Sequence, residues 1–124
     1  MEGLKLKFRS KFEKRIWENA GDRQLDYEPQ NPVISYHTTA RYIPDFRLPN
    51  GVLVESKGYF NSRDRGKMLR VKKQNPGLDL RILFQRAYNR ITKSPNSLTY
   101  AEWAEKHGFP WAEGDTIPEE WFDE

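Results

Sequence analysis

Two carboxylates and a lysine fall within one predicted β-hairpin. An apolar segment ends at Leu48, the turn formers 49–51 follow, and a β-branched segment then begins, a pattern typical of two antiparallel strands joined by a short turn. Asp45 precedes this turn and Glu55 follows it, so strand pairing would bring their carboxylates together at one end of the hairpin. Lys57 lies two residues beyond Glu55 and would share its face of the strand.

This combination of side chains predicts metal-dependent phosphate chemistry. Two neighbouring carboxylates repel each other unless a positive charge lies between them. Mg²⁺ suits such a place, because it binds one or two carboxylates, keeps several waters and completes its shell with a phosphate. The Lys57 ammonium could orient or deprotonate a metal-bound water, or offset charge on the phosphate. The alternative is an edge hairpin that carries an exposed Asp, Glu and Lys.

A helix is predicted near the N-terminus. Ser10 is a favourable N-cap, Glu13 stands at the third helical position, and the helix would run to about Ala20 before Gly21 ends it. Glu13 has two interpretations. It could complete a capping box with Ser10, or it could be a third carboxylate that serves a metal site, and the sequence leaves both open.

The chain length predicts a single domain over residues 1–124, and the strands and helices predicted along it make its fold class α/β. Hydrophobic residues make up 36% of the chain and charged residues 31%, so a monomer would have a thin core and a partner subunit could complete it. Cysteine is absent, which excludes disulfides and thiolate chemistry. No apolar segment approaches the ~20 residues of a membrane span, and we expect no membrane partner and a cytoplasmic protein.

The charges are unevenly distributed. Residues 1–93 contain 20 Lys and Arg against 10 Asp and Glu, a balance of +10, whereas residues 94–124 contain 1 against 8, a balance of −7. A basic body indicates a polyanionic partner, although a solvated charged surface would look the same.

The strongest basic segment is a helix predicted directly after the hairpin, which would follow an N-cap at Asn61 or Ser62 and run to about Gln74. Its cations would extend a positive surface along a nucleic acid backbone, or simply cover a solvated helix face. They are Arg63, Arg65, Lys67, Arg70, Lys72 and Lys73. The apolar segment 78–84 then predicts a buried strand, which would complete a βαβ crossover with the hairpin strand.

At this level of detail the chain resembles known nucleases. Pro44-Asp45, nine intervening residues and Glu55-Ser56-Lys57 resemble the PD-(D/E)xK nuclease motif. Further blocks in the same order extend the likeness, and together they resemble phage endonuclease I, the Holliday-junction-resolving nuclease of podophages. These blocks are Phe8-Arg9-Ser10 with Glu13, and residues 44–51, 54–58, 78–82, 105–108 and 117–121.

The resemblance implies a restriction-endonuclease-like mixed sheet flanked by helices, in a domain-swapped homodimer whose residues 33–44 bridge the lobes. It implies that Asp45, Glu55 and the Ser56 backbone carbonyl bind one or two Mg²⁺ or Mn²⁺ ions. Lys57 would assist the attacking water, and Glu13 would be a catalytic residue supplied by the other chain. The implied substrate is branched DNA, above all four-way junctions, which paired nicks would resolve in the cytoplasm of the bacterial host.

Outside the catalytic set, we expect DNA contacts from the helix cations named above and from Arg9, Lys11 and Lys93. A short N-terminal region and an acidic C-terminal segment are the two departures from the family pattern. Two other functions stay open from the residues alone. One is a different PD-(D/E)xK nuclease of restriction or repair type, and the other is a non-catalytic DNA-binding module.

Overall fold

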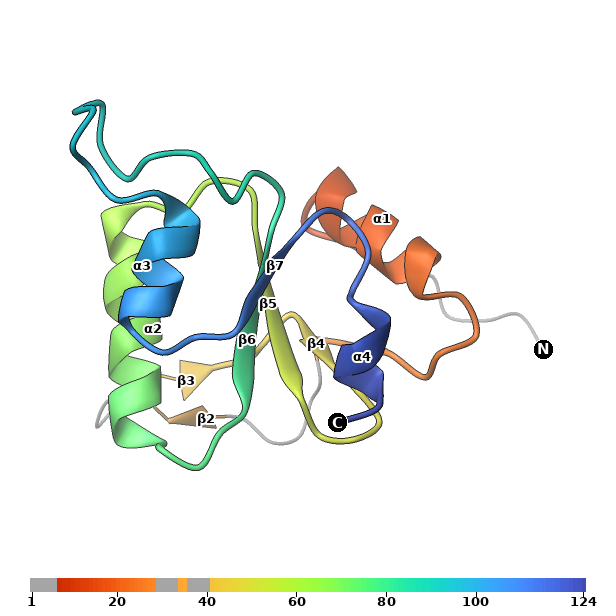
Figure 1. Ribbon diagram of the computed structural model, residues 1–124. Coiled ribbons are helices and arrows are strands. Elements are labelled where there is room, and N and C mark those ends of the chain that lie inside the picture. The colour runs from red at the N-terminus through yellow and green to blue at the C-terminus, as the bar shows by residue number, and fades with distance from the viewer. Residues whose placement is uncertain (1–6, 29–33, 36–40) are drawn as a thin grey trace.

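The computed structural model describes residues 7–28, 34–35 and 41–124 and shows a mixed α/β fold (Figure 1). The helices are α1 (Lys11–Ala20), α2 (Ser62–Gln74), α3 (Tyr100–Lys106) and α4 (Glu119–Phe122). The strands are β1 (Asp26–Tyr27), β2 (Ile34–Ser35), β3 (Arg41–Tyr42), β4 (Phe46–Arg47), β5 (Leu53–Lys57), β6 (Leu80–Phe84) and β7 (Trp111–Glu113). None of the described helices is both long enough and apolar enough to cross a membrane.

The central sheet has five strands in the order β1-β4-β5-β6-β7. Strands β1, β4 and β5 pair antiparallel, whereas β5, β6 and β7 pair parallel, which confirms the predicted mixed sheet. Strands β2 and β3 form a separate antiparallel ladder within the segment 33–44 that was predicted as a bridge. Residues 33 and 36–40 of that segment lie outside the described part of the chain, so the bridge stays a prediction.

The predicted hairpin is β4 and β5. Phe46 pairs with Val54, and the Gly51 N–H donates to the Leu48 carbonyl over 2.9 Å to close the turn. Gly51 has a φ of 92°, a conformation that glycine adopts without the steric cost of a side chain. Asp45 immediately precedes Phe46, and Glu55 immediately follows Val54. The two acids therefore lie at the same end of the hairpin, away from the turn, as predicted.

The predicted βαβ crossover is β5, α2 and β6. The parallel register runs from Leu53 opposite Leu80 to Lys57 opposite Phe84, so the carboxyl ends of both strands lie at one edge of the sheet. Ligands of open α/β sheets commonly bind at this edge. Helix α2 begins here with a reciprocal capping box between Asn61 and Asp64, which fixes the start of the helix beside the strand ends.

Helices cover both faces of the sheet. In Figure 1, α2 and α3 lie on one side of β5 and β6, and α1 and α4 lie on the other. The side chains of β5 alternate accordingly: Leu53 belongs to the core cluster with Met68 of α2, and Val54 belongs to the cluster with Ile16 of α1. The alternation continues to the end of the strand, which directs Glu55 and Lys57 towards the α2 side.

Candidate active site

A pocket of about 320 Å³ opens at the carboxyl end of β5. Its described lining holds more acidic than basic side chains, which favours a bound cation over a bound anion. The acids are Glu13, Glu28, Asp45, Glu55 and Asp64, and the bases are Arg9, Lys57 and Lys67. All four residues that the sequence predicted to be catalytic thus line one pocket, drawn from α1, the β4 edge and β5.

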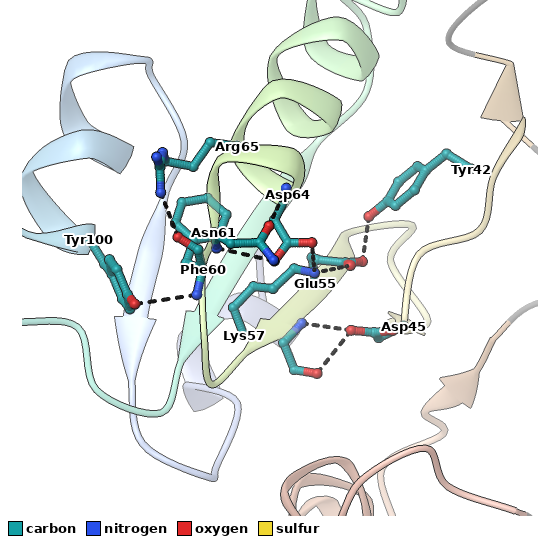
Figure 2. Close-up of polar contacts among 10 residues, drawn as sticks. Tyr42, Asp45, Glu55, Lys57, Phe60, Asn61, Asp64, Arg65 and Tyr100 are labelled. Carbon is teal, nitrogen blue, oxygen red and sulfur yellow. Dashed lines mark hydrogen bonds and ion pairs between the residues drawn. The ribbon is translucent and has the colours of Figure 1, made fainter. Parts of the chain in front are cut away.

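Glu55 is the most deeply buried acid of the pocket, with 4% of its surface exposed. Its Oε1 accepts a hydrogen bond of 2.6 Å from the hydroxyl of Tyr42, and its Oε2 lies 3.5 Å from the Lys57 ammonium (Figure 2). A buried carboxylate with two partners has a fixed orientation, which a metal ligand requires.

Lys57 lies between two acids. Besides Glu55, its Nζ lies 3.2 Å from Oδ1 of Asp64, so the acid that caps α2 also holds the lysine (Figure 2). Burial alone would lower the pKa of Lys57, but the Glu55 and Asp64 charges outweigh it and raise this pKa. Of the three roles predicted for Lys57, the protonated form suits orienting a water or offsetting phosphate charge, and disfavours deprotonating a water.

Asp45 is held from β5. Its Oδ2 accepts two hydrogen bonds of 2.9 Å, from the backbone N–H and from the hydroxyl of Ser56 (Figure 2). This leaves Oδ1 directed elsewhere in the pocket and gives Ser56 a positioning role through its N–H and hydroxyl. The predicted role of the Ser56 carbonyl as a metal ligand stays a prediction.

Glu13 satisfies part of both interpretations. Its backbone N–H donates to Oγ of Ser10 over 3.1 Å, as an N-cap requires. Its carboxylate, however, accepts a hydrogen bond from the hydroxyl of Tyr27 and belongs to the pocket. Within this single chain Glu13 already reaches Asp45, so the exchange of Glu13 between two chains remains a proposal.

Glu28 is a site residue that the sequence analysis missed. Oxygen atoms of Glu13, Glu28 and Asp45 all lie within 4.8 Å of one another, a spacing at which one divalent ion could bridge them. The Glu28 N–H donates to the Asp45 carbonyl over 2.7 Å, which continues the β1–β4 pairing beyond Tyr27. Glu28 has a φ of 45°, which is uncommon for a residue with a side chain.

The electrostatics of the pocket favour a bound cation. Burial, followed by the charges of Glu55 and Glu13, raises the pKa of Asp45 well above its usual value. Burial also raises the pKa of Glu55, although Lys57, Tyr42 and Lys67 counteract it. Crowded, desolvated carboxylates shift in this direction when too little positive charge lies among them, and a divalent ion would reverse the shift.

The predicted DNA contacts divide into three groups. Arg9 and Lys67 line the pocket, and the Arg9 guanidinium pairs with Glu28 over 2.6 Å. Lys72 instead donates to the Gly108 carbonyl over 3.1 Å, beside Phe109, so the structure directs it towards α3. Arg65 is also occupied, because it donates to the Phe60 carbonyl. The remaining predicted contacts are exposed, namely Lys11, Arg63, Arg70, Lys73 and Lys93.

Comparison with known proteins gives a consistent result. The family model described as phage endonuclease I matches residues 3–124. Endonuclease I of Escherichia phage T7 is 39% identical over 121 residues, which cover 94% of this chain and 79% of the phage T7 protein. Endodeoxyribonuclease 1 of Enterobacteria phage T3 is 38% identical over 110 residues, which cover 86% of this chain and 71% of the phage T3 protein.

Proposed function

The chain belongs to the phage endonuclease I family, and we propose that it is a metal-dependent endodeoxyribonuclease that resolves four-way and other branched DNA junctions by paired nicks. One observation carries the proposal: Glu13, Asp45, Glu55 and Lys57 share a pocket at the carboxyl end of β5, beside a strongly basic helix. Carboxylates supply the hard oxygen ligands of Mg²⁺ or Mn²⁺, and the helix supplies cations for a phosphate backbone.

The residues of the pocket fit one or two such ions. Asp45 and Glu55 would hold one, together with the Ser56 carbonyl. Glu13, Glu28 and Asp45 would hold a second. Glu13, Asp45 and Glu55 each have one oxygen engaged by a hydroxyl donor, from Tyr27, Ser56 and Tyr42 respectively. The second oxygen of Glu55 lies 3.5 Å from the Lys57 ammonium, so an ion bound by Glu55 would lie beside Lys57.

A bound divalent ion would supply Lewis-acid chemistry, which polarises a phosphodiester and activates water. The chain's own residues do the rest. The Lys57 ammonium orients the attacking water or offsets the charge that grows on the phosphate. The α2 cations hold the DNA backbone, so selectivity comes mainly from the shape of the junction and its phosphates. The expected product carries a 5′ phosphate.

We further propose a restriction-endonuclease-like core in a domain-swapped homodimer. Resolution of a junction needs two symmetry-related nicks on opposing strands, and a twofold dimer supplies two such sites. Residues 33–44 would form the bridge, and two copies that exchanged the preceding α1–β1 unit would build the same pocket from both chains. We place this activity in the cytoplasm of the bacterial host.

The test is cleavage of a synthetic four-way junction beside a linear duplex of the same sequence, each with Mg²⁺ or with a chelator. Each strand is labelled in turn, so that nicks can be mapped on denaturing gels. We expect paired, metal-dependent nicks in the junction and little cutting of the duplex. Equal cutting of the duplex would indicate a restriction or repair nuclease, and junction binding without cleavage under any divalent ion would indicate a binding module.

A further inference from the structure

Lys67 lines the pocket from α2, three residues after Asp64 in the same helix. Its Nζ lies 5.3 Å from the centroid of the Tyr42 ring. The hydroxyl of the same ring donates to Glu55, so Tyr42 connects the lysine to the buried acid of the site. The side chain is half-buried, which distinguishes Lys67 from the exposed cations Arg63, Arg70 and Lys73 of the same helix.

The two lysines of the pocket have different partners. Lys57 lies between the carboxylates of Glu55 and Asp64, which occupy its ammonium. Among the residues that the structure describes, Lys67 has no carboxylate oxygen within ion-pair distance and instead contacts the face of an aromatic ring. An aromatic face orients an ammonium without neutralising it, so the donors of Lys67 remain available to an incoming anion.

We propose that Lys67 is a catalytic residue, which donates to a non-bridging oxygen of the scissile phosphate while Lys57 holds Glu55 and the attacking water. This proposal rests on the proposed nuclease function. A phosphate bound over the acids of the pocket would bring its oxygens close to Lys67, which lines the same pocket. Because negative charge on those oxygens grows in the transition state, the contact would strengthen as the reaction proceeds.

A purely electrostatic role in DNA binding predicts something different. A backbone contact lowers affinity when it is removed, and it leaves the cleavage rate of the bound complex unchanged. The Lys67 ammonium lies over the ring of Tyr42, whose hydroxyl donates to Glu55, so its charge is close to the groups that are proposed to act on the phosphate. Removal of Lys67 should therefore act on the rate of the bound complex.

The experiment compares Lys67→Met with the matched control Lys106→Met, an exposed lysine of α3 outside the pocket. Methionine keeps an aliphatic stem over the Tyr42 ring and removes the charge. Single-turnover cleavage of a four-way junction is measured at saturating enzyme, and junction affinity is measured separately by gel shift in chelator. We expect Lys67→Met to cleave roughly 100-fold more slowly than wild type. Its affinity should change by no more than about threefold, the scale of one phosphate contact. Lys67→Arg should restore most of the rate.

Each outcome decides between the alternatives. Equal saturated rates for Lys67→Met and Lys106→Met would overturn this inference and leave the nuclease function intact. Weaker binding with an unchanged saturated rate would also overturn it and make Lys67 a backbone contact. A wild-type protein that cuts no junction under any divalent ion would overturn the nuclease function and this inference together. Thermal melting of both variants, with Lys67→Gln as a second neutral replacement, separates loss of the charge from loss of the fold.

Discussion

The hydroxyl of Tyr42 donates a hydrogen bond of 2.6 Å to Oε1 of Glu55, and the two side chains retain only 1% and 4% of their surface exposed. Tyr42 ends β3, and Glu55 lies in the middle of β5. A residue outside the central sheet thus orients the acid at its centre. In a site where the acid must present its second oxygen to a cation, this bond determines how well the acid is preorganised.

We predict that Tyr42→Phe raises the Mg²⁺ concentration needed for half-maximal junction cleavage. The substitution keeps the ring and removes one buried hydrogen bond to a charged group, which contributes about 1.5–3 kcal/mol. The half-maximal Mg²⁺ concentration should therefore rise roughly 10-fold. Junction affinity in chelator should be unchanged. The control is Tyr88→Phe, whose tyrosine is exposed and lies beside Trp111. An Mg²⁺ dependence identical to that of Tyr88→Phe would contradict the positioning role.

Charge crowding at Asp45 predicts a gain in stability when its charge is removed. Burial and the neighbouring acids raise the pKa of Asp45 in the folded state above its ordinary value of 3.8. The folded state therefore binds this proton more tightly than the unfolded state. The associated stabilisation is complete below the unfolded pKa and is lost as the pH rises through the folded pKa.

At neutral pH in chelator, the free energy of unfolding of Asp45→Asn should accordingly exceed that of wild type by about 0.5–2 kcal/mol. The variant should therefore melt at a higher temperature. The gain should shrink as the pH falls, because wild type then protonates Asp45. It should also shrink when Mg²⁺ is added, because only wild type has the full set of ligands. Thermal melts across pH provide the measurement, and Asp22→Asn at an exposed acid is the control. A variant less stable than wild type at neutral pH in chelator would argue against charge crowding.

Local signals predicted most of the framework. Gly51 indicated the hairpin turn, and the apolar segment of β6 indicated the parallel neighbour of β5. Ser10 indicated the start of α1, and the choice of Asn61 or Ser62 as N-cap located the start of α2, where the structure has Asn61. These features depend on residues close together in sequence, where turn and capping rules apply directly. Asp45, Glu55 and Lys57 were placed together for the same reason.

The contacts that complete the site could not be predicted in this way. Glu28 reaches Asp45 because the short strand β1 pairs with β4, and strands of two residues carry no periodic signal. Nothing in the sequence indicated that Asp64 belongs to the site, because its contact with Lys57 depends on how α2 packs over β5. For Glu13, the sequence could not decide between a helix-capping role and a site role. The structure shows why: its backbone N–H donates to the capping residue Ser10, and its carboxylate belongs to the pocket.

Mixing two inactive variants tests the proposed exchange between chains. In a swapped dimer, a chain with Glu13→Gln and a chain with Glu55→Gln form one fully intact pocket, so cleavage should return to a fraction of the wild-type rate. If each pocket comes from a single chain, every pocket in the mixture carries a defect and no activity returns.

The two chains are unfolded together and refolded as a mixture, so that heterodimers form. The control mixture combines Glu55→Gln with Lys57→Met, two changes in the same strand, which leave no intact pocket in either arrangement. Recovery in the first mixture alone would support the exchange. Failure in the first mixture, with heterodimers verified, would contradict it.

The central claim is that the pocket at the end of β5 cleaves DNA with the help of a divalent ion, and Glu55→Gln and Lys57→Met test it most directly. Single-turnover junction cleavage in Mg²⁺ and junction affinity in chelator are measured for both variants. Glu18→Gln and Lys106→Met serve as matched surface controls. We predict that both pocket variants lose at least about 100-fold in rate and keep their affinity for the junction. Cleavage at the wild-type rate by either pocket variant would contradict the claim.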